Sequence, residues 1–172
     1  MGWIHPSSIA KSEPIPKGSP FKRLSQAASR HKIYVCSGLT ELCGDQVFNS
    51  AVIIDKNGKL LSLHRKINEL DIGQLYYAVG NRLQVVETEL GTLGLMICAD
   101  GFARDQVISR TLGYMGADII ISPCSWAIRS THDNKAEPYG NFWRDAYRPV
   151  SKDFNIVIAA VSNVGWVEAD PW

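Results

Sequence analysis

The sequence lacks the features that mark membrane, secreted and nucleic-acid-binding proteins. No run of about 18 apolar residues occurs, so a membrane-spanning helix is not predicted. The first twelve residues contain neither a basic stretch nor an apolar core, so no secretory signal peptide is expected. The formal net charge is only +1, and the five Trp and six Tyr do not alternate with basic residues. Neither a nucleic-acid-binding surface nor a charged membrane-binding surface is therefore predicted.

Cysteine is scarce, and its spacing does not match that of a metal site. The four cysteines are Cys36, Cys43, Cys98 and Cys124, without a C-x-x-C pair or a cluster of histidines. This pattern argues against a zinc site. Two disulfides are possible by count, but Cys36 and Cys98 lie in apolar, strand-like runs, where buried free thiols are common. We expect a reduced, cytoplasmic protein.

What the sequence does contain is ordinary for a globular protein. It has 172 residues, of which 45% are hydrophobic and 20% are charged. This length is sufficient for a hydrophobic core without disulfides or metals to reinforce it. We therefore expect a single domain over residues 1–172.

The hydrophobic pattern alternates between helical and strand-like segments and predicts an α/β fold. Helices are expected over 19–32, 103–114 and 138–152, and strands over 33–39, 47–55, 59–65, 83–89, 93–98, 119–121 and 156–161. Ser19 is expected to cap the first helix, and Asn57-Gly58 predicts a hairpin. Pro149 should kink or end the last helix. The strands at 119 and 156 are expected to be buried.

The stretch Gly91–Arg104 is the strongest candidate for chemistry. An apolar run ends at Cys98, Asp100 and Gly101 follow, and a helical pattern then begins. This order places a thiol at the carboxyl end of a strand, facing the amino end of a helix, where unpaired N–H groups favour an anion. A cysteine so placed can have a lowered pKa and act as a nucleophile. The alternative is a small hydrophobic residue buried at the end of a strand.

Three neighbours are candidates to support this thiol. Lys66 ends the hairpin strand, and beside a thiolate its charge would lower the thiol pKa and stabilise an oxyanion. A lysine at a strand end is otherwise solvated. The backbone N–H of Ala99 would donate to an oxyanion if the turn is tight. Asp100 is expected to cap the helix that follows Cys98.

Four segments occur in a fixed order and spacing, and this combined pattern is more specific than any one segment alone. They are residues 59–66, the run 91–100 that ends in Leu95-Met96-Ile97-Cys98-Ala99-Asp100, residues 116–123, and Ser162-Asn163-Val164-Gly165. Together they resemble the nitrilase superfamily, the carbon–nitrogen hydrolases. The resemblance extends from about residue 13 to residue 172.

The resemblance implies an α-β-β-α sandwich, incomplete here, with a Glu–Lys–Cys site that needs no metal or organic cofactor. Cys98 would attack an amide, nitrile or carbamoyl carbon, and Lys66 would stabilise the developing negative charge. Water would then hydrolyse the thioester, with a glutamate as general base. The implied partners are a small-molecule amide or nitrile and further copies of the chain in a homo-oligomer.

The general base of this family has no counterpart in the sequence. The family's base glutamate ends a first strand, upstream of the segment that matches 21–39, and we expect that strand, its helix and the C-terminal strands to be missing. Glu13 comes at the wrong point in the order, and Glu41 stands where the family often has an ordinary surface acid. We therefore assign no base. The alternative hypothesis is a catalytically impaired fragment that acts only as an interaction partner of full-length subunits.

Further residues are candidates by position. Many family members have a second glutamate hydrogen-bonded to the lysine, and Glu69 is the nearest candidate, although its spacing is short. Trp126 and Glu137 are expected to line a substrate pocket, as are His132, Tyr139 and Trp143. The alternative is that these are core aromatics and surface polar groups. A flavodoxin-like ligand-binding domain is disfavoured because no glycine-rich phosphate loop follows the first strand.

Overall fold

Two β-sheets form the centre of the computed structural model, which describes residues 9–165. The first sheet is antiparallel, with the order β1 (Val35–Cys43), β2 (Gln46–Ile54) and β3 (Leu60–Arg65). The second has the order β4 (Val85–Thr88), β5 (Gly91–Leu95), β6 (Ile119–Cys124) and β7 (Val157–Ser162). In it β4 runs antiparallel to β5, whereas β5, β6 and β7 are parallel.

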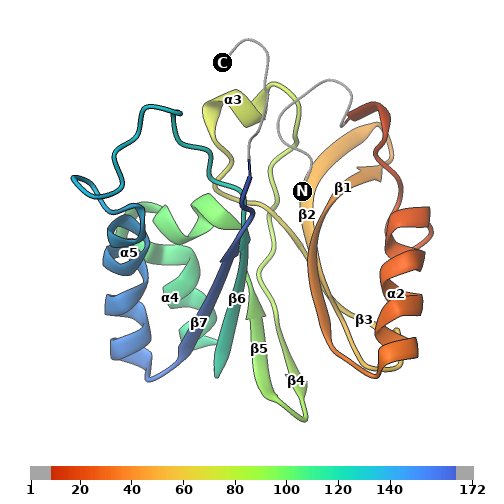
Figure 1. Cartoon of the computed structure of the whole chain (residues 1–172). Coiled ribbons are helices and arrows are strands. Elements are labelled where there is room, and N and C mark those ends of the chain that lie inside the picture. The colour runs from red at the N-terminus through yellow and green to blue at the C-terminus, as the bar shows by residue number, and fades with distance from the viewer. Residues whose placement is uncertain (1–8, 166–172) are drawn as a thin grey trace.

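Helices cover the outer faces of both sheets, which gives a mixed α/β fold (Figure 1). Helix α2 (Ser19–His31) lies against the first sheet, and α4 (Val107–Tyr114) and α5 (Tyr139–Phe154) lie against the second. The short helix α3 (Asp71–Gln74) belongs to the connection between β3 and β4. Among the described residues, no helix is both long and apolar enough to cross a bilayer.

Strand β2 contributes to a core on each of its faces, because successive side chains of a strand point to opposite sides. The smaller core lies between α2 and the first sheet and comprises Phe21, Ala28, Val52 and Ile54. The larger core joins the two sheets to α4 and α5, and β2 contributes Ala51 and Ile53 to it. The run 51–54 is continuously apolar because both of its faces are covered.

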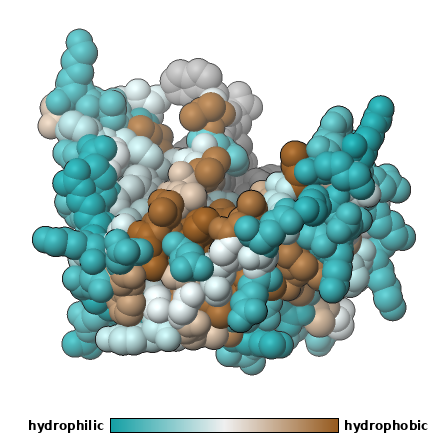
Figure 2. Space-filling view, turned by 90° about the horizontal axis from the view of Figure 1, so that it is seen from below, coloured by the Kyte–Doolittle hydropathy of each residue, from teal (hydrophilic) through white to brown (hydrophobic). Residues whose placement is uncertain are grey.

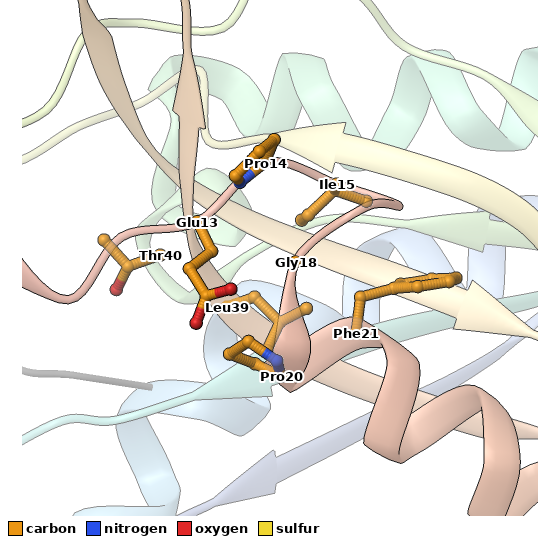
Figure 3. A pocket seen from close by; sticks show the side chains of 8 residues that line it. All are labelled: Glu13, Pro14, Ile15, Gly18, Pro20, Phe21, Leu39 and Thr40. Carbon is orange, nitrogen blue, oxygen red and sulfur yellow. The ribbon is translucent and has the colours of Figure 1, made fainter.

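The predicted elements are present, with shifted ends. The hairpin turn at Asn57-Gly58 is confirmed, and Gly58 has a φ of +85°, which favours glycine. The start of α2 differs from the prediction, because Gly18 rather than Ser19 is the N-cap. Glu13 instead accepts the Ser19 N–H at Oε2, at 2.7 Å. Figure 3 shows this carboxylate beside the start of the helix, in a cavity of about 10 Å³, room for about one water.

The C-terminal half differs from the prediction in two respects. Of the two outcomes expected at Pro149, a kink or the end of the helix, the second is wrong, because α5 ends only at Phe154. Pro149 is exposed, so water can solvate the carbonyl that its missing N–H leaves free. Strand β7 is not buried, because Val157 is 60% exposed and Val161 is 66% exposed. Strand β6 alternates between buried and half-buried residues instead of being enclosed on both faces.

Hydrophobic side chains gather at one end of the molecule. Figure 2 views the lower end of Figure 1 and shows them across its middle, between polar side chains on both sides. Leu90 in the β4–β5 turn and Val157 at the start of β7 are among the exposed large hydrophobic residues. Strand β7 therefore presents apolar surface at the edge of the described sheet.

Candidate active site

Cys98 lies in a sharp turn directly after the second sheet. Strand β5 ends at Leu95, and Cys98 is the first residue of a short 3-10 helix, Cys98–Phe102. Its φ is +48°, a left-handed conformation that is uncommon for residues with a side chain and that clusters at functional sites. The expected helix over 103–114 begins only at Val107, because Asp105 and Gln106 have left-handed φ values. The helix dipole of α4 therefore does not act directly on this thiol.

Local contacts, rather than a helix, stabilise the Cys98 thiolate. The largest influence on the pKa of Cys98 is a hydrogen bond with the Cys124 thiol, which lowers it. Burial of Cys98 has the opposite effect and raises the pKa. Three further groups also lower this pKa: the backbone N–H of Ser125, the charge of Lys66 and the backbone N–H of Ala99. Together they lower the pKa of the Cys98 thiol from 9.0 to about 7. Cys98 is only 7% exposed, so these contacts act with little screening by water.

Lys66 is buried beside Glu69. It follows the last residue of β3, is 4% exposed, and its Nζ donates a 2.7 Å hydrogen bond to Glu69 Oε1. Glu69 is 6% exposed, and its other oxygen, Oε2, has no hydrogen-bond partner among the described residues. The short spacing between the two residues is therefore compatible with a direct ion pair.

Asp100 joins the lysine segment to the cysteine turn. Its Oδ1 accepts the backbone N–H groups of Ile67 and Asn68, at 3.0 and 2.7 Å. Its Oδ2 accepts the Ile97 N–H at 2.8 Å and hydrogen-bonds His64 Nε2 at 2.7 Å. Asp100 does not cap the helix that follows Cys98, as was expected, because α4 begins after Gln106. It caps the turn that contains Cys98 instead, and it fastens that turn to the chain on both sides of Lys66. It is fully buried, so water does not compete for these bonds.

Glu13 and Glu41, neither of which was assigned as the general base, make structural contacts elsewhere. Glu13 caps α2, as described above. Glu41 is 2% exposed, which corrects the expectation of a surface acid. Its carboxylate pairs with Arg65 at 2.6 and 2.9 Å and accepts the Ser50 hydroxyl at 2.6 Å.

The expected pocket residues are divided between core and surface. Trp126 packs edge-on against Phe102, with ring centroids 5.6 Å apart, and also contacts Phe142 and Trp143. The Glu137 side chain is exposed in the loop before α5. These positions favour packing for Trp126 and solvation for Glu137. Within residues 9–165, acidic, His and Cys side chains form no group of three that could hold a metal ion.

Comparison with known proteins assigns the chain to a family. A family model described as carbon-nitrogen hydrolase matches residues 1–168. The chain belongs to the carbon–nitrogen hydrolase family. This agrees with the motif order described above.

Individual members of the carbon–nitrogen hydrolase family are similar over part of their length. A probable nitrilase of Schizosaccharomyces pombe is 26% identical over 152 residues, 87% of this chain and 52% of the relative. A nitrilase of Pyrococcus abyssi is 30% identical over 115 residues, 66% of this chain and 43% of the relative. The structure of a carbon–nitrogen hydrolase from Helicobacter pylori matches with a TM-score of 0.78 and 26% identity, covering 88% of this chain and 53% of that one. The chain thus spans about half the length of these relatives.

The contacts of two residues in this carbon–nitrogen hydrolase family member were not predicted from the sequence. Cys124 is not among the candidate site residues predicted above, although its hydrogen bond is the largest influence on the pKa of the Cys98 thiol. Asp100 had been assigned only a local cap. The contact of Cys124 depends on strand register, which the tertiary fold sets: Leu95 pairs with Ile121, and both cysteines lie three residues further on. No local signal exists for the contacts from Asp100 to residues 64–68.

Proposed function

We propose that the chain carries the nucleophilic half of a hydrolase acting on non-peptide carbon–nitrogen bonds of an amide, nitrile or carbamoyl substrate. The observation that carries this proposal is the Cys98 turn, in which a buried thiol has a pKa lowered to about 7. A thiolate attacks carbonyl and nitrile carbons far better than a thiol does. The bond formed would be a thioester or thioimidate at Cys98, and ammonia or an amine would leave.

In this proposal Lys66 and Ala99 stabilise the anion that forms on the substrate. The charge of Lys66 and the N–H of Ala99 already act on the Cys98 sulfur. When the sulfur becomes bonded to carbon, these donors become available to the adjacent oxyanion. Glu69 is a positioning residue, because its hydrogen bond fixes the Lys66 ammonium. No general base is assigned, and hydrolysis of the thioester is the step that most needs one.

The wider proposal concerns the whole chain. The arrangement of helices outside two sheets supports a partial α-β-β-α sandwich of the nitrilase type, in one domain over 1–172 (Figure 1). We further propose a small-molecule substrate, a homo-oligomer and a cytoplasmic location. Four free cysteines support a reducing compartment.

The test is ammonia release from a panel of small amides, nitriles and carbamoyl compounds, measured for this chain and for Cys98→Ser. We expect slow turnover that the variant abolishes, because loss of a general base costs about 10²–10⁴-fold in rate. Equal release by both proteins would refute a hydrolase role for this chain.

A second candidate is an interaction partner without turnover. It is favoured by the engagement of Glu13 and Glu41 in structural contacts. This candidate predicts association with itself or with a full-length relative in sedimentation experiments. A chain that is both strictly monomeric and inactive would contradict both candidates.

A further inference from the structure

The two buried cysteines follow one another's register at the same end of the second sheet, Cys98 in the turn after β5 and Cys124 as the last residue of β6. Leu95 of β5 pairs with Ile121 of the parallel strand β6, and the Met96 N–H donates to the Ile121 carbonyl at 3.1 Å. Cys98 and Cys124 each follow this pair by three residues. Neighbouring strands are about 4.8 Å apart. This spacing falls within the Cα separation of about 4.4–6.8 Å that a disulfide requires.

The thiols also interact. Both belong to the larger core, and a hydrogen bond with the Cys124 thiol is the largest influence that lowers the pKa of Cys98. The Cys124 proton has a second acceptor, because its sulfur also lies 3.2 Å from the Ser122 carbonyl. Cys98 therefore accepts a hydrogen bond from a thiol that is itself held in place.

A cavity reaches the pair from the side of Cys124. Cys124 lines an open cavity of about 210 Å³ between β1 and β6, which also borders Cys36. A water molecule occupies about 30 Å³, so the cavity admits a molecule of the size of hydrogen peroxide. Cys98 itself retains 7% of its surface.

We propose that Cys98 and Cys124 form a reversible intramolecular disulfide when the chain meets a hydroperoxide. The bond would block the nucleophile and then be released by thiols. The loss of activity rests on the proposed function, whereas formation of the bond does not.

The chemistry balances with one peroxide per pair of cysteines. The Cys98 thiolate attacks one peroxide oxygen, the O–O bond breaks, and the departing hydroxide takes a solvent proton to become water. Cys98 is thereby oxidised to a sulfenic acid. The Cys124 sulfur then attacks the Cys98 sulfur, the S–O bond breaks, and the hydroxide leaves as water with the Cys124 proton.

The structure also explains why Cys124 can act in the second step. Its pKa is raised, chiefly because its proton is bonded to the Cys98 thiolate. A neutral sulfenic acid at Cys98 removes that cause, so Cys124 loses its proton more readily after the first oxidation.

The experiment treats the intact chain with an equimolar amount of hydrogen peroxide, blocks the remaining thiols with N-ethylmaleimide, and maps tryptic peptides without reduction. Peptide 83–104 should appear joined to peptide 111–129, two hydrogen atoms lighter than their sum, and dithiothreitol should separate them. Cys98 as sulfinic acid beside an alkylated Cys124 would overturn the proposal, as would a bond from Cys124 to peptide 33–56, which holds Cys36 and Cys43.

Two variants separate the explanations. Cys36→Ser should form the bond like the parent, because Cys36 borders the cavity but is not among the groups that shift the pKa of Cys98. Cys124→Ser should instead accumulate Cys98 sulfinic acid that dithiothreitol does not reverse. Turnover should fall with the cross-linked fraction and return on reduction. If ammonia release is absent from the start, the hydrolase proposal fails, but the peptide map still tests the disulfide.

Discussion

At Cys98, reactivity is a property of contacts rather than of sequence position. The expected helix dipole is replaced by individual donors, among which Cys124 ranks above Lys66. The sequence singled out Cys98 and Lys66 as candidates because both follow strands in a specific motif order. It could not predict that a second thiol is the main stabiliser, since Cys124 lies 26 residues away and meets Cys98 only through strand register.

The first prediction concerns the pH dependence of Cys98 alkylation. A pKa lowered to about 7 means that iodoacetamide should modify Cys98 with a midpoint near that pH, whereas an ordinary thiol has its midpoint at about 8.5. Cys124→Ala should move the midpoint upward, because it removes the largest stabilising contact. Cys36→Ser should leave it unchanged, since burial raises the pKa of Cys36 to about 12 and Cys36 is not among the groups acting on Cys98. A midpoint for Cys98 above 8 in the parent chain would contradict this assignment.

The second prediction concerns Asp100. Its replacement by Ala would leave the Ile67, Asn68 and Ile97 N–H groups and His64 Nε2 without their acceptor. Breaking a buried hydrogen-bonded pair from one side costs about 3–5 kcal/mol, which we expect in the free energy of unfolding measured in urea. The matched control is Asp153→Ala, whose half-exposed pair with Arg110 should contribute about 0–1 kcal/mol. Similar losses in both variants would argue against a special role for Asp100.

At the scale of elements, local signals succeeded where the physics is local. The Asn57-Gly58 turn and the amphipathic α2 were predictable because turn geometry and helical periodicity need no distant partner. The exposure of β7 was not predictable, since an apolar run reads the same whether or not a neighbour covers it. The passage of α5 through Pro149 was missed because exposure of the affected carbonyl depends on the tertiary fold.

The third prediction concerns the end of β3. Gly80 donates its N–H to the Lys66 carbonyl at 2.8 Å, and a Cβ at this position would overlap the Arg65 carbonyl oxygen. Gly80→Ala should therefore displace the segment that carries Lys66, slow the alkylation of Cys98 at pH 7, and cost about 1–3 kcal/mol of stability.

Its control is Gly140→Ala, where a Cβ would meet only the flexible end of Arg144, at 3.0 Å. Because Gly140 is near the start of α5, alanine there should change stability by less than about 1 kcal/mol. If Gly80→Ala alkylates at the parent rate, the position of Lys66 does not depend on this contact.

At the scale of the whole molecule, the described sheet leaves β7 with one strand neighbour and with exposed apolar residues. The fourth prediction is that Val157→Lys suppresses concentration-dependent association seen by light scattering, because edge charges prevent strand pairing between molecules. Val157 is 60% exposed, so stability should change by no more than about 0.5 kcal/mol. Val107→Lys adds the same charge at a 55% exposed site away from the sheet edge and should have a smaller effect on association.

The site is divided between the two sheets: Lys66 follows β3 of the first, and Cys98 follows β5 of the second. The reactivity of the Cys98 thiol therefore reports how firmly the two sheets are held together. If the sheets separate before their strands unravel, Cys98 loses the lysine charge while it still keeps its partner on β6. Pulsed thiol labelling during unfolding would then resolve the separation of the sheets as a distinct step, without a probe attached beforehand.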